Sequence, residues 1–474
     1  SIASDQSQWI RFKGKRLSPN AKYWWKVRAE YSYSSSIDGK KTKKAWTEWS
    51  LPSSWSMGLM HEYRWKGYWI GMEHANPWDR EDEHSRLSAR YFRRTFPLAS
   101  EVKRATLHIC GLGLYEAYID GSLISKGTKN DLSRLGDIVM TPAPTDYRKS
   151  IIYNTFDITP LLQNDRSKHC IAVTVSNGRF YTMQQNKKKH KITNFGYPCL
   201  RANLIIEYNN GKTETIATDD KLWRLNADGA IRSANEYDGE IYDARKQFGG
   251  SAKAWTSPDF DDSSWQLAQR SAIPSGSLIG NLTPPMRILD TLRVKHSSTI
   301  GNAIVMDFGQ NYAGWTRINT AACRLSKGDT LRIRYAERLN ADGSLYTANL
   351  RHAQSTDYYI ADGKTDSWWA PRFTTHGGRY IEVSVIGKSC PQLSADDVIG
   401  EVVSDDMTRK GQFSCGNMTL NRLMQNAYWG ILSNYKGMPI DCPQRDERQP
   451  WLGDRTMGCW GESFLLDNGA LYLK

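Results

Sequence analysis

The chain has 474 residues, of which 39% are hydrophobic and 24% are charged, and its net charge at pH 7 is +13. This length suggests about three domains at roughly 100–200 residues each, and no stretch approaches the ~18 apolar residues of a membrane-spanning helix. The eight cysteines are scattered without a C-x-x-C pair, which argues against a zinc site and against a dense disulfide framework.

The positive charge includes two basic runs, GKKTKK at 39–44 and KKKHK at 187–191. Both are interpreted as loops between strands, and no recognition helix lies beside them, so we expect no nucleic-acid partner. A polyanionic polysaccharide would benefit from a positive surface. The 18 tryptophans and 24 tyrosines also offer rings on which sugars stack, although core packing accounts for most of them.

For about the first 400 residues the hydrophobic pattern has a period of two. Segments such as ATLHICGLGLYEAYIDG (105–121) and LRANLIIEYNNGKTETIAT (200–218) alternate between apolar and polar residues and contain glycine and asparagine turn signals. This pattern predicts antiparallel β-sandwiches. We expect a small β unit at 1–63, one sandwich at 64–283 and a second at 284–405, with the Pro/Gly/Ser-rich stretch 270–289 near their boundary.

From about residue 411 the period changes. In GNMTLNRLMQNAYWGILSNYKGMP (416–439) apolar residues recur at spacings of three and four, which predicts a helix. Asn417 or Thr419 is a suitable N-cap, and KGMP supplies the glycine and proline that end a helix. A second helical stretch is expected at about 455–467. Because two helices cannot enclose a core, we expect further helical structure after Lys474.

The loop DCPQRDERQPWLGD (441–454) places six ionisable side chains between these helices. Its prolines, Pro443 and Pro450, exclude a continuous helix. Glycoside hydrolysis is carried out by paired carboxylates in a shaped pocket, and Glu447 is the candidate acid. The acidic neighbours of Glu447 would raise its pKa, while Arg445 and Arg448 would lower it, so the sequence leaves the direction open.

On the residues alone, three interpretations of this loop stand. It is a carbohydrate site, in which aspartates accept sugar hydroxyls and Trp451 offers a stacking face, or an ion-pair network that pins a loop between helices. The third is a calcium site, because oxygen ligands are available although histidine is absent. For three other polar patches a structural role is preferred over a sugar or metal contact. They are Tyr237, Asp238, Glu240, Tyr242 and Asp243; Asp307, Gln310, Asn311 and Trp315; and His376.

The loop resembles the signature of bacterial α-L-rhamnosidases, glycoside hydrolase family 78, which is commonly D-C-P-x-R-x-E-R-x-G-W-x-G-D. It departs from the signature at Pro450, where glycine is usual, and this change alters the turn before Trp451 without removing a functional group. The matching residues are Asp441, Cys442, Pro443, Arg445, Glu447, Arg448, Trp451, Gly453 and Asp454.

The resemblance extends over nearly the whole chain. Residues 1–63 resemble a fibronectin-III-like module without its first strands, 64–283 a lectin-like jelly-roll sandwich, 284–405 the following β domain, and 406–474 the opening of the family's (α/α)6 barrel. It therefore implies a multidomain, mainly β fold that ends in an incomplete barrel.

The family pattern implies a role for each matching residue. Glu447 would be the general acid that protonates the departing glycosidic oxygen. Asp441, Arg445 and Asp454 would hold the rhamnose hydroxyls, and Trp451 would pack against the ring and its C6 methyl. No metal ligand and no cofactor is expected, although calcium in a β-sandwich module is left open.

These enzymes invert configuration, so a second carboxylate must activate water on the opposite face. In the family this base is a glutamate far downstream, and the resemblance implies that it lies outside these 474 residues. The 474 residues alone are therefore expected to show negligible hydrolysis.

The leading hypothesis is an exo-acting α-L-rhamnosidase that acts on rhamnose-containing glycans or glycosides, with no nucleic-acid partner and no membrane span. One alternative is a carbohydrate-binding or adhesin-like β protein in which the loop is structural. Another is an (α/α)6 glycosidase for a different sugar. A periplasmic or extracellular location is expected from the substrate, while the oligomeric state is not indicated.

Overall fold

A computed structural model describes residues 4–5, 11–34, 42–81, 86–127, 134–163, 166–181, 195–249, 254–364 and 368–474. The basic run 187–191 lies outside these residues. The chain forms two compact units, Ser1–Trp65 and Lys66–Lys474, where the sequence prediction places the first boundary at residue 63.

The first unit is built from two antiparallel strand pairs. Its rings pack on each other, with Tyr23 stacked on Trp55 at a centroid distance of 5.5 Å. The pairs are β1 (Lys22–Trp25) with β4 (Ser53–Ser56), and β2 (Glu30–Ser34) with β3 (Thr42–Trp46).

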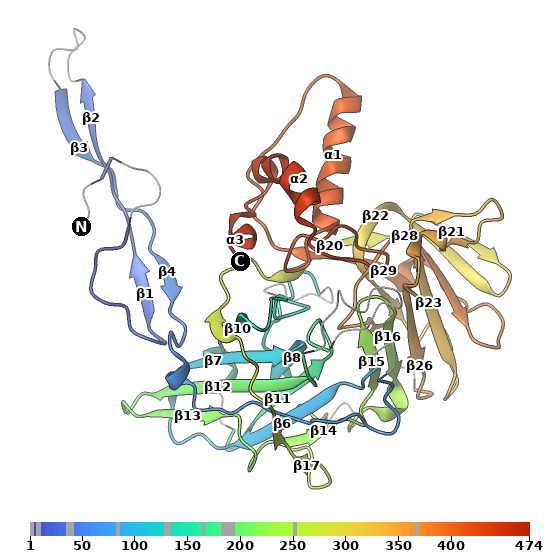
Figure 1. The fold of residues 1–474 in the computed structure, drawn as a ribbon, viewed down its shortest axis with the longest axis horizontal. Coiled ribbons are helices and arrows are strands. Elements are labelled where there is room, and N and C mark those ends of the chain that lie inside the picture. Colours follow the sequence, from blue (N-terminus) through green and yellow to red (C-terminus); the bar gives the residue numbers. More distant parts are fainter. Residues whose placement is uncertain are drawn as a thin grey trace. The chain divides into compact units, whose positions relative to one another are not determined.

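The second unit begins with a two-sheet sandwich, as the alternating pattern predicts (Figure 1). Alternate residues such as Ile171 and Val173 on one sheet and Leu204 and Ile206 on the other are buried in a shared core. One sheet has the order β18 (Gln269–Arg270), β5 (Ile70–Gly71), β12 (Cys199–Tyr208), β7 (Val102–Leu112), β10 (Ser150–Asp157), β19 (Ser277–Gly280), with β13 (Thr213–Ala217) beside β12. The other has the order β17 (Gln266–Leu267), β14 (Arg224–Asn226), β6 (Arg90–Phe96), β11 (His169–Ser176), β8 (Leu114–Ile119), β9 (Ser122–Leu123).

The strands of the second β domain, which the sequence predicts to be a sandwich, are joined by hydrogen bonds in one order. The 17-residue strand β22 has a register shift between Asp307 and Tyr312 and pairs with different partners along its length, so hydrogen bonds connect all its strands. The order is β15 (Ile231–Asn235), β16 (Gly239–Asp243), β26 (Thr356–Ile360), β23 (Thr330–Ala336), β28 (His376–Val385), β22 (Ala303–Asn319), β29 (Val398–Asp405), β20 (Met286–Arg293), with β21 (His296–Ile300) and β27 (Trp368–Trp369) also on β22. A separate small pair is β24 (Arg338–Leu339) with β25 (Leu345–Tyr346).

The hairpin β15–β16 comes before the predicted domain boundary at residue 283 but pairs with the second sheet. Its strand β16 pairs in parallel with β26. Glu240 of β16 accepts hydrogen bonds from the backbone N–H groups of Arg372 and Phe373. The pairing partner of a strand is a long-range choice that local periodicity does not encode.

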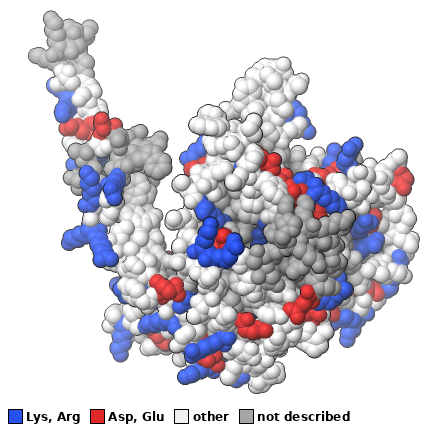
Figure 2. Space-filling model, viewed as in Figure 1, with Lys and Arg blue, Asp and Glu red and all other residues white. Residues whose placement is uncertain are grey.

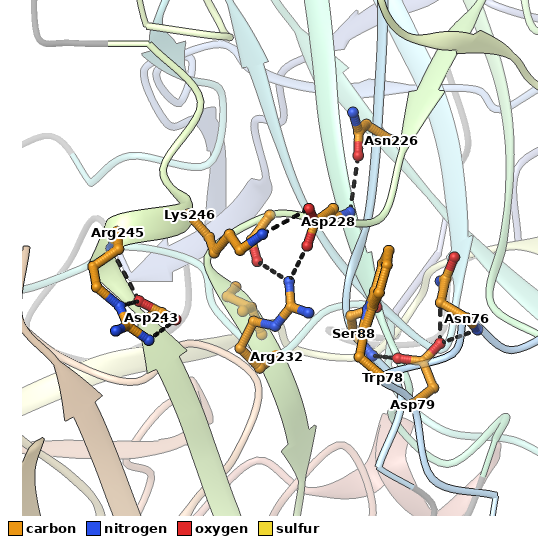
Figure 3. A network of polar contacts seen from close by, with 12 residues as sticks. Asn76, Trp78, Asp79, Ser88, Asn226, Asp228, Arg232, Asp243, Arg245 and Lys246 are labelled. Carbon is orange, nitrogen blue, oxygen red and sulfur yellow. Dashed lines mark hydrogen bonds and ion pairs between the residues drawn. The ribbon is translucent and has the colours of Figure 1, made fainter. Parts of the chain in front are cut away.

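Ion pairs fix the segments that flank this hairpin (Figure 3). Asp228 accepts from Arg232 at 2.7 Å and from Lys246 at 2.8 Å, and Asp243 forms a bidentate pair with Arg245 at 2.8 Å. The Asp243 carboxylate is therefore occupied by a cationic side chain.

Three α-helices follow in the described part of the chain, α1 (Met418–Ser433), α2 (Leu452–Leu465) and α3 (Gly469–Tyr472). The predicted N-cap Asn417 is confirmed, because its side chain accepts from the N–H groups of Thr419 and Leu420. Helix α2 starts earlier than the predicted residue 455, with Trp451 at its N-cap. Helix α1 packs against β22 and β29 (Figure 1).

The end of β29 anchors the segment that follows α1. The Asp405 carboxylate accepts from the N–H of Gly437 at 2.8 and 2.9 Å, and the Ser404 hydroxyl donates to the carbonyl of Leu432 at 2.7 Å. Both anchoring side chains are fully buried. All eight cysteines are free thiols.

Trp315→Phe should destabilise the second β domain by about 1–3 kcal/mol. Phenylalanine has no indole N–H, so the buried carboxylate of Glu401 loses the hydrogen bond that Trp315 donates. The Trp315 Nε1 lies 2.5 Å from Glu401 Oε2, and both side chains are buried. The measurement is the urea midpoint followed by far-UV circular dichroism. Trp369→Phe is the matched control, because its buried Nε1 has no partner among the described residues. Equal losses in both variants would contradict the prediction.

Candidate active site

The charged loop runs between the end of α1 and the start of α2 and closes on itself. The backbone N–H of Asp441 donates to the carbonyl of Gln449 at 3.0 Å, and the N–H of Gln449 donates to the Asp441 carboxylate at 2.6 Å. The segment between these residues is not helical, as Pro443 and Pro450 predict. The result is a compact turn that presents residues 444–448.

Arg448 is the buried centre of this turn. Its side chain is 1% exposed and its backbone φ is +50°. The guanidinium donates to the carbonyl of Thr375 at 2.7 Å, and to the carbonyls of Gln444 at 3.3 Å and Arg445 at 3.1 Å. A planar guanidinium with five N–H donors suits such a set of diverging acceptors. Arg448 therefore joins the two sides of the turn and connects the turn to the segment that directly precedes β28.

The β15–β16 hairpin and the lectin-like domain hold the same turn from another direction. The Tyr237 hydroxyl donates to the carbonyl of Glu447 at 3.1 Å, and Arg179 donates to the carbonyl of Arg448 at 2.6 Å. Arg179 is itself held by Glu236, with an N–O distance of 2.9 Å. Tyr237, which the sequence assigns to a structural corner, therefore contacts the backbone of the candidate acid.

Three donors converge on the carboxylate of Glu447. Arg351 Nη1 lies 2.7 Å and Arg445 Nε 3.2 Å from Oε2, and Trp451 Nε1 lies 2.9 Å from Oε1. Each donor stabilises a negative charge. Both oxygens of Glu447 therefore accept hydrogen bonds from side chains.

These contacts decide whether the pKa of Glu447 is raised or lowered, which the sequence leaves open. Burial by itself raises the pKa of Glu447, but the hydrogen bonds from Arg351, Trp451 and Arg445 outweigh burial and lower the pKa to about 2. Glu447 is therefore a carboxylate at neutral pH in the absence of a ligand.

The other predicted site residues differ in their exposure and in their contacts. The Asp441 side chain is 6% exposed and pairs with Arg445 at 2.8 Å, so one of its oxygens contacts a cation while the other closes the turn. Trp451 is 37% exposed. Asp454 is exposed in the first turn of α2, where the positive end of the helix dipole favours a carboxylate.

Cys442, another residue of the motif, is buried and uncharged. Burial raises the pKa of its thiol to about 11, so the group is not a nucleophile at neutral pH. Arg455 of α2 donates to the carbonyl of Ile440 and pairs with Glu462 at 2.7 Å. These contacts join the start of the turn to α2.

Glu337 connects the turn to the second β domain and was missed by sequence reasoning. Its carboxylate accepts from Gln444 at 3.0 Å, from Asn349 at 3.0 Å and from Asn311 at 2.9 Å. A pocket of about 370 Å³ lies beside it, between α1, the turn and the β domain.

Arg351 was missed as well, although the segment that contains it was noted for its resemblance. Arg351 is 96 residues away from Glu447 in sequence, and nothing in its neighbourhood indicates that contact. It follows the 3-10 helix Ala348–Leu350 and has a φ of +57°, a conformation that a non-glycine residue adopts only when its surroundings impose it. Sequence periodicity carries no signal for such a position.

Among the described residues no group of three or more His, Cys, Asp or Glu side chains is arranged to hold a metal ion, so the calcium hypothesis gains no support there. Within the same residues no helix combines the length and apolar character that a membrane crossing requires. Figure 2 shows basic side chains in many separate places on the visible face, interspersed with acidic ones.

Family models match four consecutive segments of the chain. Residues 1–61 match a Rha78A-like N-terminal immunoglobulin domain, 100–290 an α-L-rhamnosidase N-terminal domain, 298–404 a bacterial α-L-rhamnosidase concanavalin-like domain, and 408–474 a bacterial α-L-rhamnosidase 6 hairpin glycosidase domain. The chain belongs to the bacterial α-L-rhamnosidase family. The candidate active site lies in the segment that matches the glycosidase domain.

Individual α-L-rhamnosidases match the chain along most of its length. One from Formosa agariphila is 33% identical over 95% of this chain and 46% of its own length. One from Streptomyces avermitilis is 36% identical over 84% of this chain and 36% of its own length. The chain thus spans less than half the length of these two relatives.

Solved α-L-rhamnosidases have the same fold. The structure from Dictyoglumus thermophilum has a TM-score of 0.83 and 33% identity, and the match covers 98% of this chain and 48% of that one. The structure from Aspergillus terreus has a TM-score of 0.83 and 29% identity over 99% of this chain and 50% of that one.

Arg448→Met should loosen the turn of this rhamnosidase-family chain, because three carbonyl groups lose a buried donor. At about 1–3 kcal/mol for unsatisfied buried groups, exchange of the amide hydrogens of Asp441 and Gln449 should accelerate about tenfold or more. Hydrogen exchange read by mass spectrometry on peptides covering 441–451 measures this change. Arg422→Met, at an exposed position of α1, is the control. Unchanged exchange in Arg448→Met would contradict the assigned role.

The lowered pKa of Glu447 predicts a pH-dependent contribution to stability. An unfolded glutamate titrates near ~4.3, so the contribution is fully present above that pH and is lost as the pH falls through about 2. The difference in urea midpoint between the native chain and Glu447→Gln should therefore be constant from pH 7 to 5 and shrink between pH 4 and 2. A difference that grows on acidification would show that the folded-state pKa is raised.

Proposed function

We propose that the protein hydrolyses terminal, non-reducing α-L-rhamnose from glycans or glycosides, with inversion of configuration and with Glu447 as the general acid. The observation that carries the proposal is the placement of Glu447. It lies at the tip of a turn that both β domains support, within the segment that matches a glycosidase domain. Three side-chain donors direct its carboxyl group.

In this reaction Glu447 transfers its proton to the glycosidic oxygen as the bond from that oxygen to C1 of rhamnose breaks. Water attacks C1 from the opposite face and passes a proton to a general base, which gives a product of inverted configuration. The two carboxyl groups of an inverting enzyme lie ~6.5–9.5 Å apart. We assign no residue of this chain as the base, and the proposal places it in a part of the protein outside these 474 residues.

The residues predicted to bind the substrate make contacts that are compatible with that role. Asp441 and Arg445 form an ion pair next to Glu447 and would bind rhamnose hydroxyls together. Asp454 is exposed and would accept a further hydroxyl. The half-exposed indole of Trp451 would pack against the ring and its C6 methyl, an apolar group that suits an aromatic surface.

The helices α1 to α3 would be the first part of an (α/α)6 barrel. Besides the family match over 408–474, exposed apolar side chains support this. Large apolar residues on helices that face water mark a contact surface. Those more than half exposed are Met418, Leu423, Leu452, Met457, Trp460 and Phe464.

No cofactor is needed for this reaction, and its partner is a rhamnose-containing glycoside, oligosaccharide or polysaccharide. Such substrates are met outside the cytosol, so the proposal includes a periplasmic or extracellular location.

The proposed role of Glu447 depends on its protonation state. A general acid must hold a proton before it reacts, whereas three donors lower the pKa of Glu447 to about 2. Under the proposal, substrate binding therefore raises the pKa of Glu447, as burial by a bound sugar would do.

Glu447→Gln should lower the rate of rhamnose release about 10²–10⁴-fold, the usual contribution of a general acid. The loss should be greater for an alkyl rhamnoside, whose leaving group needs a proton, than for a nitrophenyl rhamnoside. The measurement compares both substrates in the 474-residue chain and in any natural form that extends beyond Lys474. Asp467→Asn, at an exposed position after α2, is the control.

Activity only in an extended form would support both the rhamnosidase activity and the placement of the base. Activity in the 474-residue chain would refute that placement. If no form releases rhamnose, a different sugar or a binding function without catalysis replaces the proposal. Sugar binding that is indifferent to Glu447→Gln would favour the binding function.

A further inference from the structure

The first unit, Ser1–Trp65, carries a row of alternating indole rings and cations. The guanidinium carbon of Arg28 lies 4.6 Å from the ring centroid of Trp46 and 4.6 Å from that of Trp49. The Nζ of Lys26 lies 4.6 Å from the ring centroid of Trp49. Each cation is attracted by the electrons of a ring. We call Trp46, Arg28, Trp49 and Lys26 the cation ladder.

The cation ladder is separate from the apolar packing of the unit. That packing is made by Tyr23 of β1, which stacks on Trp55 of β4, and by Phe12, whose ring lies 6.3 Å from that of Trp55. The indoles of the ladder are instead largely in contact with solvent, because Trp46 is 54% exposed and Trp49 is 47% exposed. The ladder is therefore a surface feature that a partner can reach.

Backbone and hydroxyl groups hold the ladder segment in place without the rings. The N–H of Thr47 donates to the carbonyl of Ala29 at 2.9 Å, and the N–H of Ala29 donates to the Thr47 hydroxyl at 3.0 Å. Ser50 and Val27 exchange the same two kinds of bond at 2.8 and 3.0 Å. These four hydrogen bonds fix residues 47–50 against residues 27–29. The exposed indoles and cations are thus not needed to attach the segment.

Positive charge is concentrated in this unit. Residues 1–65 contain twelve lysines and arginines and five aspartates and glutamates, so they carry +7 of the net charge of +13. Lys44 pairs with Glu30 at 3.2 Å. Within the described ranges of the chain, no acidic side chain pairs with Lys26 or Arg28. The charges of these two ladder residues are therefore available to an anionic partner.

We propose that the cation ladder binds an acidic polysaccharide, whose carboxylate or sulfate groups pair with Lys26 and Arg28. The ladder belongs to a different compact unit from the candidate active site, so the inference goes beyond the proposed function and does not depend on it. A protein held on a polymer in this way meets the chain ends of that polymer at a raised effective concentration.

The arrangement favours a polymer over a small anion. The rings hold the two cations in position, so less side-chain freedom is lost on binding than with unsupported lysines. An exposed ion pair is nevertheless weak, at about 0–1 kcal/mol. A partner must therefore present many anionic groups along one chain to bind firmly.

The arrangement also favours a polysaccharide over a nucleic acid. Single-stranded nucleic acids bind basic, aromatic surfaces by stacking their bases on the faces of the rings. In the ladder, Arg28 and Lys26 already lie over the rings of Trp46 and Trp49. The pairing of carboxylate or sulfate groups with these cations needs no such stacking.

The test is calorimetric titration of the whole chain with polygalacturonate, dextran sulfate and uncharged dextran. The native protein should bind at least one of the two acidic polymers and should not bind dextran. The affinity should fall by about tenfold or more between about 50 and 500 mM NaCl, because salt screens exposed charges. The double variant Lys26→Gln/Arg28→Gln should bind about tenfold more weakly than the native protein, as expected for two exposed ion pairs.

The matched control is Lys103→Gln/Lys212→Gln, which removes the same charge from exposed positions in the second unit. This variant should keep the native affinity within about twofold, because its lysines are not part of the ladder. Equal losses in the two double variants would show attraction by net charge alone and would overturn the inference. Absence of binding to both acidic polymers would overturn it as well.

Trp49 tests the ladder with every charge left in place. Trp49→Ala should lose about as much affinity as Lys26→Gln/Arg28→Gln, while Trp49→Phe should keep most of it, because phenylalanine still offers a ring to the cations. Circular dichroism checks the fold of each variant. Native affinity in a folded Trp49→Ala would overturn the inference, and if Trp49→Ala does not fold, the two double variants decide.

Two further outcomes are distinguished. Tighter binding of a single-stranded thymidine oligonucleotide than of either acidic polymer would overturn the choice of partner. Release of rhamnose is not read in these titrations, so failure of the proposed function leaves this test intact, and failure of this test leaves the proposed function in place.

Discussion

The site depends on the hydrogen bonds that the buried guanidinium of Arg448 donates. It donates to the carbonyls of two residues of the turn and to Thr375 in the second β domain, so it fixes the shape of the turn and its place on the domain at once. A buried cation is costly unless its donors are satisfied, and here backbone carbonyls satisfy them. Glu447 directly precedes Arg448, and its orientation follows from this constraint.

The β domains are therefore part of the candidate site. Arg179 from the lectin-like domain and Tyr237 from the β15–β16 hairpin hold the backbone of the turn. Glu337 and Arg351 from the second β domain contact its side chains. A catalytic group needs a rigid support to keep its geometry, and most of that support is long-range. This arrangement explains why a helical segment with a small core of its own presents an ordered turn.

The charge state of Glu447 connects the structure to the proposed chemistry. In the empty site the carboxylate is stabilised by three donors, two of which are fixed by the turn and by α2, whereas the third comes from the exposed side chain of Arg351.

The sequence by itself determined the features that depend on local pattern. Periodicity and turn residues predicted the strands and α1, the Asn417 cap was correct, and a fourteen-residue motif located the turn and its family. The tertiary structure decided three things: the pairing of β15–β16 with the second sheet, the continuous ten-stranded sheet, and the contact of Arg351 with Glu447. Each joins residues far apart in the chain, and neither strand register nor the direction of a pKa shift is encoded by neighbouring residues.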